Sequence, residues 1–162
     1  MRRVAISMEE LVPLLQLQLQ TSGSAMLNVT GGSMMPMLYS RRDSVKLAPA
    51  QNLKGKGQLI LYRRDSGVYV LHRILRQRKG VYICCGDNQF YTEKIRPDQV
   101  LAVVTDFTRK GKPHSVEEKS YQLYVRLWCG FHPVRWVYLI PRRVAGWVLT
   151  GIRRLRYRIK KK

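Results

Sequence analysis

The chain has 162 residues, and its 30 Lys and Arg against 10 Asp and Glu give a formal net charge of +20 at pH 7. That length suits one domain with appended segments and is large enough for a substantial core. A transmembrane helix needs about 20 consecutive, mostly apolar residues. The sequence has no such run and no secretory-signal pattern, so we expect no membrane-spanning segment.

The first predicted element is a short amphipathic helix that ends at about Gln20. Ser7 and Glu10 form a capping-box pattern at its start, and Pro13 falls early in it, where a proline kinks a helix. We expect this helix to pack on the rest of the domain, as a segment 1–24 that precedes the core.

A short apolar strand at 25–29 leads into a glycine-rich turn and a serine. Gly31 and Gly32 come directly before Ser33, and Pro36 follows three residues later. The glycines leave room for an approaching main chain, and the proline ends the strand. Ser33 is therefore a candidate nucleophile, although the same residue types also occur in ordinary loops.

The clearest pattern in the chain is a β-hairpin. Residues 68–76 alternate as a strand that carries His72, and a second strand covers 81–85. Between them, Lys79 and Gly80 predict a two-residue turn in which the glycine takes a positive φ.

The register of that hairpin decides what lies opposite His72. With Lys79 and Gly80 as the turn, His72 is opposite Asp87, with Cβ atoms about 4.5–5.5 Å apart. At that distance a carboxylate can hold an imidazole nitrogen. A slip of one residue would instead place Gly86 or Asn88 there.

In chain order, Ser33, His72 and Asp87 supply a hydroxyl, an imidazole and a carboxylate. These are the groups that let a serine attack an amide at neutral pH. Each also has a plainer interpretation: a loop serine, a half-buried structural histidine, and an aspartate that caps its own turn.

The three cysteines predict neither a disulfide nor a metal site. Cys84 and Cys85 are neighbours on a strand and point to opposite faces, so they should not pair with each other. Cys129 is distant, and no histidine–cysteine spacing suggests zinc. We expect reduced thiols, no metal and no cofactor, in a cytoplasmic setting.

The segment 108–162 is predicted to be a linker followed by helices. We expect the linker at 108–113, and Ser115 with Glu118 forms a second capping-box pattern. Aromatic and apolar residues then recur at helical spacing until Gly130.

The end of this segment is strongly basic. From Arg126 to Lys162 there are eleven Lys and Arg and no acidic residue, and apolar residues recur every three or four positions after Pro141. A basic amphipathic helix near tryptophans is typical of a membrane-surface element, so an anionic membrane is an expected partner. Alternatively, the helix covers the core with its charges solvated, or binds an acidic partner; nucleic acid is disfavoured because no base-reading motif accompanies it.

Three blocks of sequence together resemble the signal-peptidase and LexA-like superfamily of serine peptidases. They are Gly32-Ser33-Met34-Met35-Pro36, Val70-Leu71-His72-Arg73-Ile74 and Gly86-Asp87-Asn88-Gln89. His72 stands where bacterial signal peptidases and self-cleaving repressors have a lysine. The chain is thus more similar to the endoplasmic-reticulum, archaeal and sporulation-type signal peptidases, which use Ser/His. It departs from these membrane enzymes in that residues 1–32 contain no apolar run long enough to span a membrane, so we expect no membrane anchor there.

The resemblance implies a mainly β fold: a bent antiparallel β domain, with the peptidase core at 25–107, one N-terminal helix and basic C-terminal helices. It implies Ser33 as nucleophile, His72 as general base and Asp87 as orienting acid. A further acidic residue is implicated in the Ser/His branch, and Glu93 could share or take over that role.

The implied activity is a serine endopeptidase that cleaves a leader or signal-like segment of a precursor peptide bound in extended form. We expect it in the cytoplasm, peripheral on the inner face of the membrane. Two alternatives remain: autocleavage as in repressor relatives, and a non-catalytic basic module that binds membrane or nucleic acid on the same fold.

Overall fold

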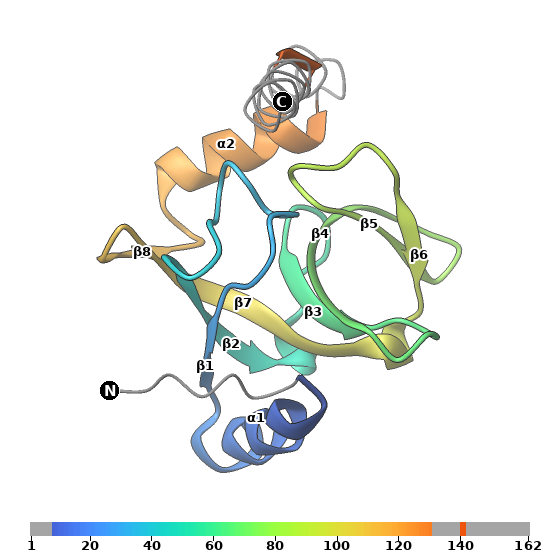
Figure 1. Cartoon of the computed structure of the whole chain (residues 1–162). Coiled ribbons are helices and arrows are strands. Elements are labelled where there is room, and N and C mark those ends of the chain that lie inside the picture. The colour runs from blue at the N-terminus through green and yellow to red at the C-terminus, as the bar shows by residue number, and fades with distance from the viewer. Residues whose placement is uncertain (1–7, 131–139, 142–162) are drawn as a thin grey trace, which may run out of the picture.

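The described part of the chain forms one antiparallel sheet of eight strands, with a helix before it and a helix after it (Figure 1). This computed structural model describes residues 8–130 and 140–141. The helices are α1 (Met8–Ser22) and α2 (Lys119–Gly130). The strands are β1 (Ala25–Asn28), β2 (Ser44–Pro49), β3 (Leu59–Arg63), β4 (Tyr69–Arg78), β5 (Val81–Cys85), β6 (Glu93–Ile95), β7 (Val100–Arg109) and β8 (Lys112–Ser115). The predicted mainly β domain with a helix at its N-terminal end is confirmed.

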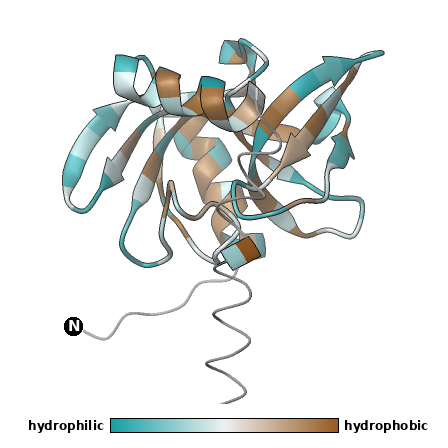
Figure 2. Ribbon diagram, turned by 90° about the horizontal axis from the view of Figure 1, so that it is seen from above, coloured by the Kyte–Doolittle hydropathy of each residue, from teal (hydrophilic) through white to brown (hydrophobic). Residues whose placement is uncertain are grey.

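The strands are ordered β1-β2-β7-β3-β4-β5-β6, and β8 pairs with β7. The long strand β7 therefore lies between β2 and β3 and joins the first strands of the chain to the β3–β6 meander. In Figure 1, α1 lies below the β1 end of the sheet and α2 lies above it. Hydrophilic residues mark the hairpin tips, while hydrophobic residues follow the inner strands and the inner faces of the helices (Figure 2).

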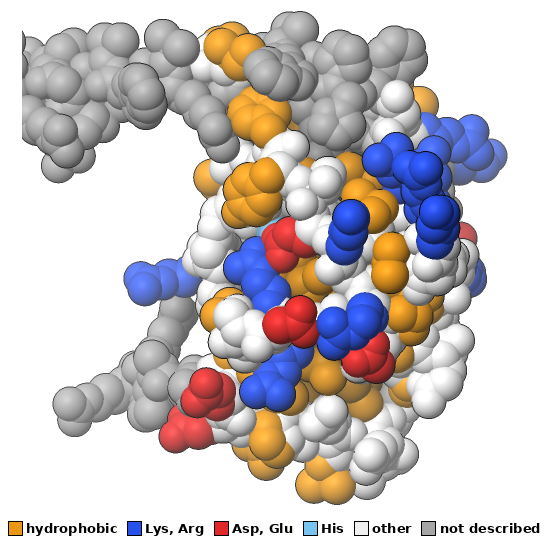
Figure 3. All heavy atoms as spheres, turned by 90° about the vertical axis from the view of Figure 1, so that its right-hand side faces the viewer, with side chains coloured by type: hydrophobic (Ala, Val, Ile, Leu, Met, Phe, Trp, Pro, Cys, Tyr) orange, Lys and Arg blue, Asp and Glu red, His pale blue; other side chains and the backbone are white. Residues whose placement is uncertain are grey.

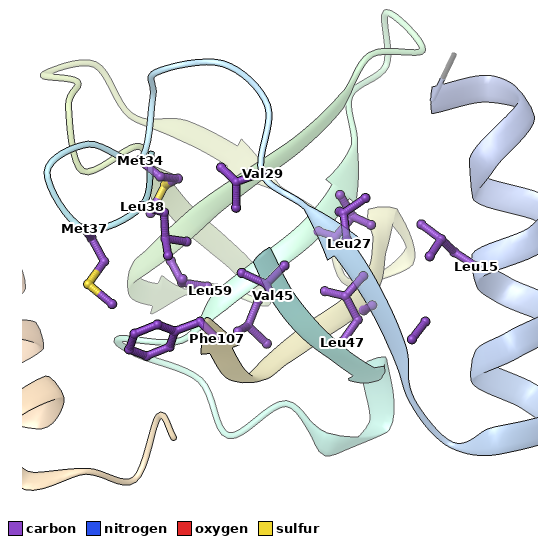
Figure 4. Close-up of a cluster of buried hydrophobic side chains, with 14 of the residues drawn as sticks. Leu15, Leu27, Val29, Met34, Met37, Leu38, Val45, Leu47, Leu59 and Phe107 are labelled. Carbon is purple, nitrogen blue, oxygen red and sulfur yellow. The ribbon is translucent and has the colours of Figure 1, made fainter. Parts of the chain in front are cut away.

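The larger buried cluster joins both helices to the sheet. Leu15 of α1 approaches Leu27 and Leu47 of the first two strands, as Figure 4 shows. Tyr121 and Val125 of α2 belong to the same cluster. A second, smaller cluster fills the space between β3, β4, β5 and β7. Both helices are therefore held by buried apolar contact rather than by their own propensity.

Helix α1 has the predicted amphipathic pattern. Val12, Leu15 and Leu19 are buried and recur every three or four residues, which places them on one face. Ser7 of the predicted capping box lies outside the described residues.

The predicted linker at 108–113 is wrong. Strand β7 continues to Arg109, and a tight turn with positive φ at Lys110 and Gly111 leads into β8. The second capping pattern is present: the Ser115 backbone N–H donates to Glu118 Oε1 at 2.9 Å just before α2 begins. The basic amphipathic helix predicted after Pro141 lies outside the described residues.

None of the helices in residues 8–130 and 140–141 has the length and hydropathy needed to cross a bilayer.

Candidate active site

The predicted hairpin forms with the predicted turn. Lys79 and Gly80 have φ of 48° and 75°, the two positive values that a type I′ turn requires. Arg78 pairs with Val81 as expected. The sequence is thus sufficient to fix the end of the hairpin nearest the turn.

Farther from the turn, the register departs from the prediction because of a β-bulge. The pairing shifts between Ile74 and Arg76, which makes Leu75 an extra residue on β4. Beyond the bulge Arg73 pairs with Cys85. Because one extra residue exchanges the two faces of a strand, the prediction that Asp87 lies opposite His72 is wrong.

The shift brings Arg73 to Asp87. Arg73 Nε and Nη2 donate to the two Asp87 carboxylate oxygens at 2.9 and 2.7 Å, and both side chains are fully buried. Two side chains of α2 complete the arrangement: the Tyr124 hydroxyl donates to Asp87 at 3.0 Å, and Trp128 Nε1 donates to its backbone carbonyl at 3.1 Å. The Asp87 carboxylate therefore joins the sheet to α2.

The turn that carries Asp87 also holds the loop of Ser33. The Asn88 backbone N–H donates to the Ser33 carbonyl at 2.8 Å, and Asn88 Nδ2 donates to the Gly32 carbonyl at 3.1 Å. From the other side, Met34 and Leu38 are buried in the larger core cluster, and Figure 4 shows both side chains within it. The backbone at Ser33 is thus fixed from both sides.

Gly86 shows how closely Ser33 and His72 approach each other. A Cβ atom placed on Gly86 would lie 2.7 Å from the Ser33 carbonyl oxygen and 3.0 Å from His72 Nε2. The approach to the Ser33 backbone is shorter than real Cβ atoms make and the approach to His72 is unusually tight, so any side chain here would require the Ser33 loop to shift. Gln89 Oε1 lies 2.9 Å from the same point. That oxygen is buried and has no hydrogen-bond partner among the described residues.

Ser33 and His72 both line a cavity of about 260 Å³. Its apolar wall includes residues of the segment 27–29 and of 69–71, and its polar lining includes Arg64 and Gln89. Ser33 is partly exposed, whereas His72 is buried. The sequence blocks around Ser33, His72 and Asp87 are therefore brought together. Ser33 and His72 belong to the lining of the cavity, whereas Asp87 does not.

The other ring nitrogen of His72 points to a tyrosine and a glutamate. His72 Nδ1 lies 3.0 Å from the Tyr62 hydroxyl and 3.4 Å from Glu93 Oε1. Arg64 binds Glu93 through two contacts of 2.6 Å, Nε to Oε2 and Nη2 to Oε1. The carboxylate beside the imidazole is therefore that of Glu93, which the family resemblance gave as the alternative to Asp87.

Electrostatics set the protonation of these groups. Burial lowers the pKa of His72 to about 4, although Glu93 opposes this. Burial alone would raise the pKa of Glu93, but the hydrogen bonds and charge of Arg64 outweigh burial and lower it. Burial also raises the pKa of Tyr62. Near neutral pH the imidazole is neutral, the carboxylate is charged, and the phenol keeps its proton.

Cysteine chemistry receives no support from this site. Cys84 and Cys85 are buried thiols. Burial raises the pKa of Cys84 to about 12, so that thiol stays protonated and unreactive.

The low pKa of His72 predicts a pH-dependent stability. An unfolded histidine titrates near 6.5, so below that pH the unfolded chain binds a proton that folded His72 accepts only near pH 4. The stabilising contribution of neutral His72 is complete above about pH 6.5 and is lost as the pH falls to about 4, a loss of about 3 kcal/mol. Urea unfolding at several pH values should show this loss, and the loss between about pH 6.5 and pH 4 should be smaller in His72→Gln.

His114→Gln is the matched control, because His114 is a partly exposed histidine on β8 that pairs with Glu118. An equal pH slope in the wild type and His72→Gln would contradict the assignment of a depressed pKa to His72.

Sequence reasoning missed Tyr62 and Arg64. Both come from β3 and the turn that follows it, and they reach Glu93 about 30 residues away. An apolar run at 59–62 marks a buried strand there, but no local pattern indicates that its tyrosine would face His72.

Comparisons of this chain with protein-family models, with curated proteins and with solved structures found no match.

Proposed function

We propose that this protein is a serine endopeptidase with Ser33 as nucleophile and His72 as general base. The observation that carries this proposal is the crowding at Gly86, where the backbone of Ser33 and Nε2 of His72 lie within 3.0 Å of one point. Nucleophilic catalysis by serine requires a hydroxyl that reaches the accepting nitrogen of a neutral imidazole, and the proximity of these two residues supports that role.

In the proposed mechanism, Ser33 Oγ attacks the scissile carbonyl while His72 Nε2 accepts the hydroxyl proton. The imidazolium then protonates the leaving amine, and a water molecule releases the acyl group by the same steps. The Ser33 backbone N–H is the proposed donor to the oxyanion, since Gly31 offers no hydroxyl.

The acidic member of the site is proposed to be Glu93 rather than Asp87. Glu93 lies 3.4 Å from His72 Nδ1, while both Asp87 oxygens are engaged by Arg73. A negative charge on this side stabilises the imidazolium that forms during attack. Asp87 then contributes by fixing the turn that holds the Ser33 loop.

Two strand edges favour a substrate bound in extended form. Strand β1 is at the edge of the sheet, and residues 69–72 of β4 pair with β3 on one side, while the pairing with β5 begins at Arg73. The cavity is lined by these two segments. A peptide added here as a strand would find backbone partners, and Gln89 Oε1 would accept one of its N–H groups.

The proposed substrate is a leader or signal-like segment of a precursor, and the fold is proposed to be related to the signal-peptidase and LexA-like superfamily. The three sequence blocks that resemble this superfamily are the ones that meet at the cavity. Basic side chains gather on the face that carries β5 and β6 (Figure 3), with Arg76, Arg78, Lys79 and Lys94 exposed. Such a surface supports an anionic partner, including a membrane.

The test is cleavage and covalent labelling. The full chain, with and without vesicles containing an anionic lipid, is incubated with candidate precursor peptides and analysed by mass spectrometry. A fluorophosphonate probe is added in parallel. We expect defined cleavage products and a probe adduct on Ser33, both absent in Ser33→Ala.

Absence of both products and adduct in all conditions would overturn the proposal. Self-shortening of the wild type that Ser33→Ala prevents would identify autocleavage instead. Salt-sensitive vesicle binding without any proteolysis, unchanged in Ser33→Ala, would identify a non-catalytic module.

A further inference from the structure

The Tyr62 hydroxyl is the group in direct hydrogen-bond contact with the inner nitrogen of His72. Its distance of 3.0 Å from Nδ1 lies within the usual range for such bonds, whereas the 3.4 Å from Nδ1 to Glu93 Oε1 exceeds it. The Tyr62 and His72 rings meet edge to face, and both are buried. The tyrosine is therefore held in place by packing as well as by this contact.

Arg64 explains why Glu93 does not take the place of the Tyr62 hydroxyl as the hydrogen-bond partner of His72 Nδ1. Its guanidinium binds both carboxylate oxygens at 2.6 Å, which holds the carboxylate at its present distance from the ring. The Tyr62 hydroxyl and Glu93 Oε1 both lie within 3.4 Å of the same His72 nitrogen, and the charge of Glu93 contributes to the raised pKa of Tyr62. Tyr62 is therefore positioned to connect the carboxylate to the imidazole.

Two proton arrangements are possible for these three groups, and the charge of Glu93 distinguishes them. A carboxylate only accepts, a phenol has one proton to donate, and a neutral imidazole carries one proton on either nitrogen. With the imidazole proton on Nδ1, His72 donates to the Tyr62 oxygen and Tyr62 donates to Glu93. With the proton on Nε2, Tyr62 donates to Nδ1 instead of to Glu93. No proton then lies between the ring and the carboxylate, and the Nδ1 lone pair faces Glu93 at 3.4 Å, which is repulsive.

The favoured arrangement leaves a lone pair on Nε2, the ring nitrogen that lies beside Gly86 and the Ser33 backbone. We propose that Tyr62 is a positioning residue that relays the charge of Glu93 to His72 and thereby fixes the tautomer in which Nε2 accepts a proton. The catalytic consequence rests on the proposed peptidase function, but the tautomer itself does not.

Tyr62→Phe tests the relay, because it keeps the ring and removes only the hydroxyl. Long-range ¹H–¹⁵N correlation of the histidine ring nitrogens at pH 7 should show His72 mainly as the Nδ1–H tautomer in the wild type. The signal is assigned by its loss in His72→Gln. In Tyr62→Phe we expect a clear shift toward Nε2–H and a fall in kcat of about 10- to 100-fold with KM within about twofold, a part of what general-base catalysis supplies.

Tyr82→Phe is the matched control, because Tyr82 is a half-buried tyrosine on β5 that packs against the smaller core cluster. It should leave the His72 tautomer and kcat unchanged. Glu93→Gln tests the relay from its other end and should shift the tautomer in the same direction, which keeps the test decisive should Tyr62→Phe fail to fold.

A wild-type His72 protonated on Nε2 would overturn the relay, as would a Tyr62→Phe variant with the wild-type tautomer. If the wild type cleaves nothing but the tautomer responds as expected, the relay stands and the peptidase function fails. A loss of kcat in Tyr62→Phe without any change of tautomer would give Tyr62 a structural role only.

Discussion

Replacing His72 with glutamine is expected to lower kcat/KM for peptide cleavage by at least about 10³-fold, within the range that general-base catalysis and its coupling to the nucleophile supply. Glutamine approximates the size of the ring and can still meet the Tyr62 hydroxyl, but it cannot accept the Ser33 proton. Substrate binding should persist, because the cavity walls are otherwise unchanged. Steady-state kinetics and binding of the peptide to the variant would measure the two effects separately.

The control for this variant is His114→Gln on β8, outside the cavity that Ser33 and His72 line. It should retain wild-type kinetics. A kcat/KM of His72→Gln within about tenfold of the wild-type value would show that the imidazole is not the general base, even if Ser33 remained essential.

Replacing Asp87 with asparagine is expected to lower the free energy of unfolding by about 3–5 kcal/mol. The substitution removes the charge that compensates Arg73, whose guanidinium is fully buried and also bonds Tyr121 and the Gly57 carbonyl. An unpaired buried cation costs far more than an exposed one, because no water replaces its partner. Urea unfolding followed by tryptophan fluorescence would measure the loss.

Glu117→Gln is the matched control, because it removes a carboxylate from an ion pair with Lys54 in which both side chains are mostly exposed. Its unfolding midpoint should stay close to that of the wild type, since exposed pairs contribute little. If Asp87→Asn instead unfolded like the wild type but lost cleavage, Asp87 would regain the catalytic role that the sequence suggested.

The local sequence pattern is sufficient to predict several elements of the fold. The apolar spacing of Val12, Leu15 and Leu19 predicts α1, and Lys79 with Gly80 predicts the hairpin turn. These features depend on neighbouring residues alone. The hairpin at 109–112 was missed, because a run of polar residues with one glycine and one proline also fits a linker.

The acidic partner of His72 could not be predicted from the hairpin alone. Strand β4 pairs with β3 in unbroken register through His72, while its pairing with β5 contains the bulge at Leu75. The register therefore depends on three strands, and nothing in the hairpin sequence identifies Leu75 as the extra residue. The roles of Tyr62 and Arg64 could not be predicted for the same reason, since Tyr62 lies on β3 and Arg64 directly follows it.

The turn at 86–88 is shared by two parts of the molecule. From α2, Trp128 Nε1 donates to the Asp87 carbonyl, and from the turn the Asn88 backbone N–H donates to the Ser33 carbonyl. Undocking of α2 would therefore remove one of the contacts that hold the turn on which the Ser33 backbone rests. The exposed Leu123 and Leu127 of α2 are therefore connected, through Trp128 and this turn, to the backbone of Ser33.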